Sequence, residues 1–163
     1  MKYTFRQDQV VIFNELIYDS SISLKSIENL VLVDNYLEFE IERRTFENVT
    51  RDKQLLFNYT YLNGKTSIVR FENVSDLVVT GLAEPFMTNH FINGITSIEN
   101  NILTIETAFG LEIKMKTNAS TTIYLVDLKD SDYGKGTING IAGFTEIEWT
   151  DFLKKEKYNL TTI

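Results

Sequence analysis

The chain has 163 residues, of which 43% are hydrophobic and 24% charged, the composition of one folded domain of ordinary size. It carries 16 lysines and arginines against 23 aspartates and glutamates, so its net charge is −7. Nucleic-acid-binding proteins are usually basic, so this balance argues against nucleic acid and favours a basic protein as the partner. The longest apolar runs, such as residues 30–33, are far too short to span a membrane.

The chain has no cysteine and a single histidine, His90. Disulfides, thiolate metal sites and cysteine nucleophiles are therefore excluded, and we expect no metal and no cofactor. The lack of cysteine and of a clear signal peptide favours a cytoplasmic protein. His90 lies near Asn89, Asn93 and Gly94, which predicts a surface loop. No Gly-x-Ser-x-Gly motif accompanies it, so we predict that the protein is not an enzyme and has no catalytic residue.

The first element, residues 9–17, has apolar residues that fit either a helix or a buried strand. Beyond it, apolar and polar residues alternate with a period of two, most clearly in 37–43. We predict a single domain over 1–163 with an all-β fold, an antiparallel sandwich or flattened barrel with a C-terminal α-helix. The predicted strands span residues 22–33, 36–44, 54–62, 65–74, 76–80, 94–99, 102–108, 111–117 and 121–128.

Turn sequences separate the predicted strands. Asn63-Gly64 is the strongest hairpin signal, because a type I′ turn requires positive φ at both central residues. This turn would pair Phe57 with Arg70 across a hairpin. Two weaker turns of the same type, and the closure of a further hairpin, are expected at Asp34-Asn35, Asn100-Asn101 and Phe109-Gly110.

The C-terminal residues change character. Thr145 and Glu148 have the spacing of a capping box, and Trp149, Phe152 and Leu153 then recur at helical spacing. We therefore predict a helix over about residues 145–157 that packs its apolar stripe on the sheet.

One string of four residues occurs twice. Ser-Ile-Glu-Asn stands at 26–29 and again at 97–100. Each copy is followed by a turn and an alternating strand, so a duplicated hairpin unit stands beside chance as an explanation.

Two groups of acidic residues invite a functional interpretation. Asp127, Asp130 and Asp132 have spacing that suits a calcium loop, but Gly134 replaces a ligand and no closing glutamate follows. We predict an acidic loop in solvent. The glutamates at 38, 40 and 42 share one strand face and are also expected to face solvent.

An aromatic stripe supplies the candidate binding site. Phe57, Tyr59 and Tyr61 lie on one face of the predicted hairpin, opposite Arg70. Tyrosine, phenylalanine and arginine are enriched at protein interfaces. The same stripe also fits the core of a sandwich, so a core face and a binding face remain alternatives.

Several stretches resemble small β-rich bacterial proteins, some of them classed as immunity proteins of polymorphic toxin systems. The stretches are Tyr18-Asp19-Ser20-Ser21-Ile22, Ser26-Ile27-Glu28, Leu37-Glu38-Phe39-Glu40-Ile41 and Ile68-Val69-Arg70-Phe71-Glu72-Asn73-Val74. The resemblance covers residues 18–117 and departs where Ile17-Tyr18 replaces a frequent Phe-His before Asp-Ser. It assigns a role to no residue.

Together, the resemblance and the acidic charge favour a non-catalytic protein-binding module. Its most specific form is an immunity-type inhibitor, because nuclease toxins tend to be basic and opposite charge speeds their capture. The alternative is a small-ligand or carbohydrate-binding β domain that uses a concave sheet face. An unrecognised hydrolase is a third hypothesis.

Overall fold

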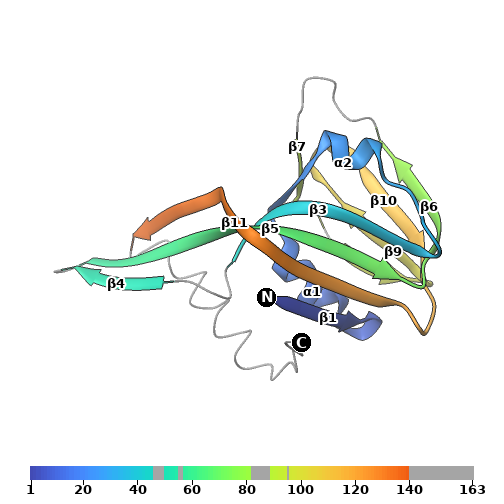
Figure 1. Ribbon diagram of the computed structural model, residues 1–163, viewed down its shortest axis with the longest axis horizontal. Coiled ribbons are helices and arrows are strands. Elements are labelled where there is room, and N and C mark those ends of the chain that lie inside the picture. Colours follow the sequence, from blue (N-terminus) through green and yellow to red (C-terminus); the bar gives the residue numbers. More distant parts are fainter. Residues whose placement is uncertain (46–49, 55–56, 82–88, 95, 140–163) are drawn as a thin grey trace.

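The computed structural model describes residues 1–45, 50–54, 57–81, 89–94 and 96–139, whose strands form two antiparallel sheets (Figure 1). Sheet A has seven strands in the order β1-β11-β5-β3-β2-β7, with β4 paired to β5, and sheet B has four in the order β6-β10-β9-β8. The strands are β1 (Lys2–Arg6), β2 (Ser20–Ser23), β3 (Tyr36–Arg44), β4 (Thr50–Gln54), β5 (Phe57–Glu72), β6 (Ser75–Thr80), β7 (Asn89–Ile92), β8 (Thr96–Glu99), β9 (Ile102–Glu106), β10 (Glu112–Lys116) and β11 (Thr122–Asn139). Neither described sheet closes into a barrel.

The two sheets share one hydrophobic core. In β3, Leu37, Phe39 and Ile41 are buried while Glu38 and Glu40 are exposed, which confirms the predicted alternation. Sheet A lies in front in Figure 1 and sheet B lies behind it. Buried apolar side chains of this core include Phe5, Phe13, Phe71, Ile92, Leu103 and Leu125.

The described helices lie near the N-terminus. The ambiguous segment is a helix, α1 (Val10–Ile17), which buries Phe13 and its apolar neighbours. A second helix, α2 (Leu24–Glu28), begins where the Ser23 hydroxyl accepts a hydrogen bond from the Ser26 backbone N at 3.1 Å. The strand predicted over 22–33 is therefore wrong beyond Ser23. The helix predicted over about 145–157 lies outside the described residues.

The repeated Ser-Ile-Glu-Asn string does not mark a structural repeat. The first three residues of its first copy lie in helix α2 and those of its second copy lie in strand β8, and the asparagine follows the element in both. The same four residues thus adopt the conformation that their neighbours impose.

The hairpin predicted at Asn63-Gly64 is wrong. Strand β5 continues through both residues, and neither has a positive φ. Phe57 accordingly pairs with Gln54 of β4 rather than with Arg70. The glycine meets a different need, because a Cβ at Gly64 would lie 2.1 Å from the carbonyl oxygen of Tyr133. That carbonyl belongs to an irregular stretch of β11, where the register with β5 shifts between Ser131 and Gly136.

The other predicted turns are confirmed. Asp34 and Asn35 have φ of 47° and 65°, and Asn100 and Asn101 have φ of 51° and 63°. Each pair closes a two-residue connection with the positive φ values of a type I′ turn. A short 3₁₀ turn, Ala108–Gly110, joins β9 to β10 as a third hairpin.

Strands β5 and β11 extend well beyond the body of the fold. They have 16 and 18 residues, and their far ends form with β4 a three-stranded arm (Figure 1). We call the place where both strands pass from body to arm the neck. The strands at the edges of the body are much shorter: β1, β7, β6 and β8 have five, four, six and four residues.

Candidate functional site

The outward face of sheet A carries three rows of side chains across four neighbouring strands. Register places one residue of β1, β11, β5 and β3 in each row, because antiparallel partners share a face. We call these twelve residues the front face. The rows, each given from β1 to β3, are Arg6-Thr122-Glu72-Tyr36, Thr4-Tyr124-Arg70-Glu38 and Lys2-Val126-Ile68-Glu40.

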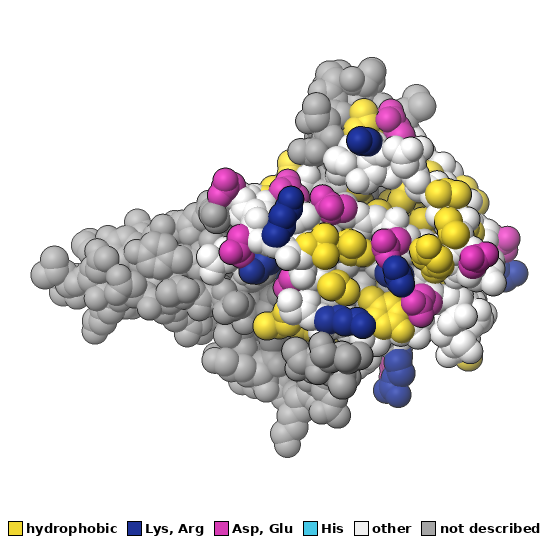
Figure 2. Space-filling model, viewed as in Figure 1, with side chains coloured by type: hydrophobic (Ala, Val, Ile, Leu, Met, Phe, Trp, Pro, Cys, Tyr) yellow, Lys and Arg dark blue, Asp and Glu magenta, His cyan; other side chains and the backbone are white. Residues whose placement is uncertain are grey.

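The centre of the front face is a shallow hollow of about 400 Å³ lined by charged, aromatic and aliphatic side chains. Figure 2 shows hydrophobic, basic and acidic side chains side by side on this surface. Arg70 organises its middle. Its Nη2 lies 2.5 Å from Glu38 Oε2, its Nη1 lies 3.6 Å from Glu72 Oε1, and its guanidinium covers the Tyr36 ring at 5.1 Å. The hydrogen bond that Arg70 donates to Glu38 raises the pKa of Arg70.

Lys2 gives the hollow its second cation–aromatic pair. Its Nζ lies 5.5 Å from the centroid of the Tyr124 ring. Burial, with Glu72 nearby, raises the pKa of Tyr124, so the phenol is neutral at physiological pH. The front face therefore combines two tyrosines, three cations, three glutamates and an aliphatic pair, Ile68 and Val126, on a scaffold of paired strands.

The front face offers aromatic, charged and aliphatic groups to another molecule. Each tyrosine ring carries a cation of its own chain, and the residues that line the hollow include no histidine, serine or cysteine. In the described ranges no three His, Asp or Glu side chains come together as a metal site.

Comparison with protein-family models, curated proteins and solved structures finds no match. None of the described helices is long and apolar enough to cross a membrane.

The structure separates the four predicted site residues. Arg70 lies at the centre of the front face, whereas Phe57, Tyr59 and Tyr61 occupy register positions in the arm. There Tyr59 pairs with Asp52 and Asn139, and the side chains of the three aromatic residues lie outside the described set. The choice between core and binding face for them stays open.

Sequence reasoning missed most of the front face. Tyr36, Tyr124 and Lys2 come from three strands that are distant in sequence, and β1 was not predicted at all. The available signal was the polar half of each alternating strand, for example the even positions of 122–126. Pairing order, which the sequence does not reveal, decides that these halves lie side by side.

The acidic group at 127–132 lies in strand β11 and not in a solvent loop, which corrects the sequence prediction. Asp127 is only 7% exposed and accepts hydrogen bonds from Arg43, whose side chain is 0% exposed. Arg43 Nη2 lies 2.9 Å from Asp127 Oδ1 and 3.2 Å from Oδ2, and the Ser67 hydroxyl donates to Oδ1 at 2.8 Å. This buried ion pair joins β3, β5 and β11 beside the neck.

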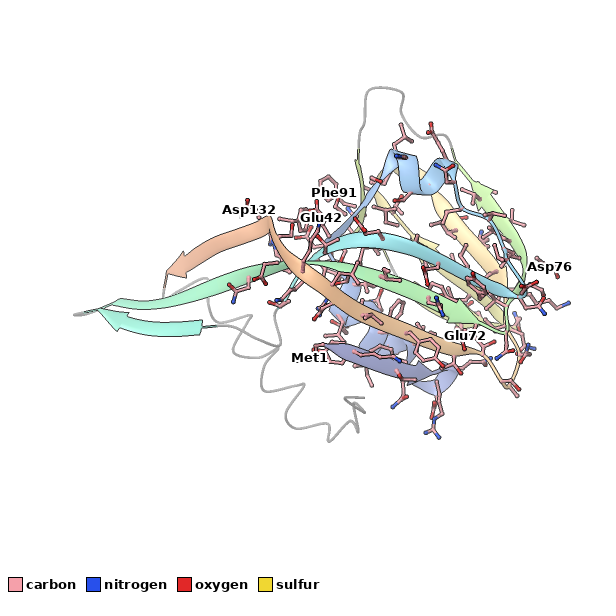
Figure 3. The ribbon with its side chains drawn as sticks, viewed as in Figure 1. Met1, Glu42, Glu72, Asp76, Phe91 and Asp132 are labelled. Atoms are coloured by element: carbon pink, nitrogen blue, oxygen red, sulfur yellow. The ribbon has the colours of Figure 1, made fainter. Side chains whose placement is uncertain are left out.

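A second polar cluster ties the irregular stretch of β11 to the rest of sheet A. The Tyr133 hydroxyl donates to the backbone carbonyl of Asp19, and the Asp19 carboxylate lies 3.1 Å from Arg44 Nη1. The Ser131 hydroxyl donates to Glu42 at 2.7 Å. Burial and the charge of Asp19 raise the pKa of Tyr133 to about 12. Figure 3 labels Glu42 and Asp132 in this region near the neck.

His90 is not a surface residue, which corrects the prediction of a loop. It lies in β7, pairs with Ile22 of β2 and is 0% exposed. Neither ring nitrogen has a hydrogen-bond partner among the described residues. The Asn-rich neighbourhood misled the prediction, because β7 is a four-residue edge strand and its inward side reaches the core.

The unpartnered imidazole leads to a stability prediction. Replacing His90 with leucine should raise the free energy of unfolding by about 1 kcal/mol, because it removes two buried polar atoms without partners at similar volume. His90→Gln keeps polar atoms in the same place and serves as the comparison. Urea unfolding measures both. A loss of more than about 1 kcal/mol in His90→Leu would show that the ring has a partner in the folded protein.

Proposed function

We propose that this protein is a non-catalytic protein-binding module that docks a partner protein on its front face. The observation that supports this most directly is the arrangement of Arg70, Tyr36 and Tyr124, three half-buried side chains that share the outward face of paired strands. Tyrosine and arginine carry a large share of binding energy at protein interfaces, particularly around an apolar centre such as Ile68 and Val126. Paired strands hold these groups in place, so little ordering is needed on binding.

The partner that fits best is a basic protein, and the specific form of the proposal is an immunity-type inhibitor that acts in the cytoplasm. The net charge of −7 and the glutamates along β3 support it. Opposite charge raises the association rate of two proteins, which is what an inhibitor of a toxic partner requires.

A carbohydrate or small-ligand binder is the second candidate. The hollow of about 400 Å³ and the tyrosine that lines it, Tyr124, favour it, since many ligand pockets fall in this size range. The cations over both rings count against it, because stacking on a sugar would need free ring faces.

A growth assay tests the leading proposal. The product of the gene adjacent to that of this protein is expressed alone and together with it, and we expect growth arrest that co-expression relieves. Arg70→Ala and Tyr124→Ala should each weaken the purified complex by about 30-fold, the effect of losing about 2 kcal/mol at an interface centre. Lys116→Ala, an exposed change on sheet B, is the matched control and should leave binding unchanged.

Three outcomes contradict the proposal. Relief of arrest that survives both front-face variants places the contact elsewhere. A neighbouring product that is harmless alone removes the immunity-type form. Retention of a glycan on an array, lost in Tyr124→Ala, replaces the leading proposal with the second candidate.

A further inference from the structure

Two charges of the front face lack an ion-pair partner within the described part of the chain. Lys2 and Glu40 make no ion pair with any described residue, whereas Arg70 pairs with two glutamates. Both belong to the same row, in which Val126 and Ile68 stand between them. Three strand spacings of about 4.8 Å separate their backbones, so one copy cannot join them directly.

A second copy of the chain can satisfy both charges at once. Rotation by half a turn about an axis that runs parallel to the strands, between β11 and β5, lays β1 of one copy over β3 of the other. Lys2 then faces Glu40 of the second copy, and Val126 faces its Ile68. The two-fold axis repeats each contact, as closed dimers require.

The neighbouring rows agree with the same axis. Tyr124 faces Arg70 of the second copy, and Arg6 faces its Tyr36, so in each of these rows a cation of one copy lies opposite a tyrosine of the other. The perpendicular axis would instead lay β1 over β1 and β3 over β3, which brings like charges together. The charge pattern therefore selects one orientation.

From this complementarity we infer that the front face closes on a second copy of this chain in a two-fold dimer. The front face is also the surface of the proposed function, so dimer and partner complex exclude each other. The inference does not require a foreign partner. Four strands and three rows cover about 20 Å by 20 Å, less than the roughly 800 Å² per partner of a stable interface. The dimer is therefore weak and sensitive to salt.

Sedimentation velocity of the full chain tests the dimer. Between about 10 μM and 1 mM we expect the sedimentation coefficient to rise at low salt and to rise much less at about 0.5 M salt. Lys2→Glu and Glu40→Lys should each weaken association at least tenfold, because each places two like-charged pairs across the axis. An equal mixture of these two variants should associate again, since every such pair then joins opposite charges.

Lys116→Glu on sheet B is the control and should associate like the unchanged protein. A protein that stays monomeric at 1 mM and low salt overturns the inference. Association that survives both single variants, or a mixture that fails to recover it, also overturns the inference. Because no partner is present, failure here leaves the proposed function standing, and loss of partner binding leaves the dimer standing.

Discussion

Replacing Asp127 with alanine is expected to lower the free energy of unfolding by about 3–5 kcal/mol. The variant removes the carboxylate that accepts hydrogen bonds from two nitrogens of Arg43, whose side chain is 0% exposed. A buried charge that loses its counter-ion costs far more than a missing pair, since water does not solvate it. Urea unfolding followed by circular dichroism measures the loss.

A double variant separates the charge from the packing. Arg43→Met with Asp127→Leu removes both charges and keeps the volume apolar, so it should recover more than half of the loss. Asp130→Ala is the control for the loss of an acidic residue in β11, because the side chain of Asp130 is 77% exposed. This variant should change the free energy of unfolding by less than about 1 kcal/mol. A loss in Asp127→Ala no larger than in Asp130→Ala would contradict a buried ion pair.

Replacing Gly64 with alanine is expected to destabilise the fold by about 3 kcal/mol or more. The added Cβ would lie 2.1 Å from the carbonyl oxygen of Tyr133 and 2.6 Å from that of Ser131. Both obstacles are backbone atoms of β11, so relief requires movement of a strand and not of a side chain. Thermal and urea unfolding measure the effect.

Gly110→Ala provides the matched control. Gly110 has a φ of +79°, and a Cβ there would meet no atom within 4 Å. The only cost of this variant is therefore that alanine disfavours a positive φ. That effect is about 1 kcal/mol. If the two variants lose the same stability, the close approach of β5 and β11 does not exist in solution.

Sequence patterning predicted the regular parts of this fold. Strand β3 was placed at its observed bounds, because a strand with one buried face alternates strictly. The turns at Asp34-Asn35 and Asn100-Asn101 were placed correctly as well, since few residues tolerate two successive positive φ values.

Tertiary contacts overrode the local signals elsewhere. Asn63-Gly64 is a strong turn sequence, yet the glycine serves the approach of another strand. Arg43 lies in a strongly charged stretch but is buried, because Asp127 of strand β11 forms an ion pair with it. His90 is embedded among loop-forming residues but fills an inward position of an edge strand.

The candidate site depended even more on long-range pairing. The residue type of Arg70 makes it a candidate in the sequence. Its neighbours on the sheet, Tyr124 and Glu38, are separated from it by 54 and 32 positions along the chain. No local pattern reports that β5 lies between β11 and β3. A single sequence therefore shows which side chains of a strand point away from the core, but not which strands bring them together on one face.

The short edge strands carry a consequence for polymerisation. Strands that add to an exposed sheet edge can go on adding, and this route leads to open fibres. In the described body of the fold each edge strand has six residues or fewer, so an incoming strand would gain few backbone hydrogen bonds. A face-to-face pair, by contrast, is complete at two copies. The edges of the body therefore favour a finite and reversible pair over an open fibre when the protein is concentrated.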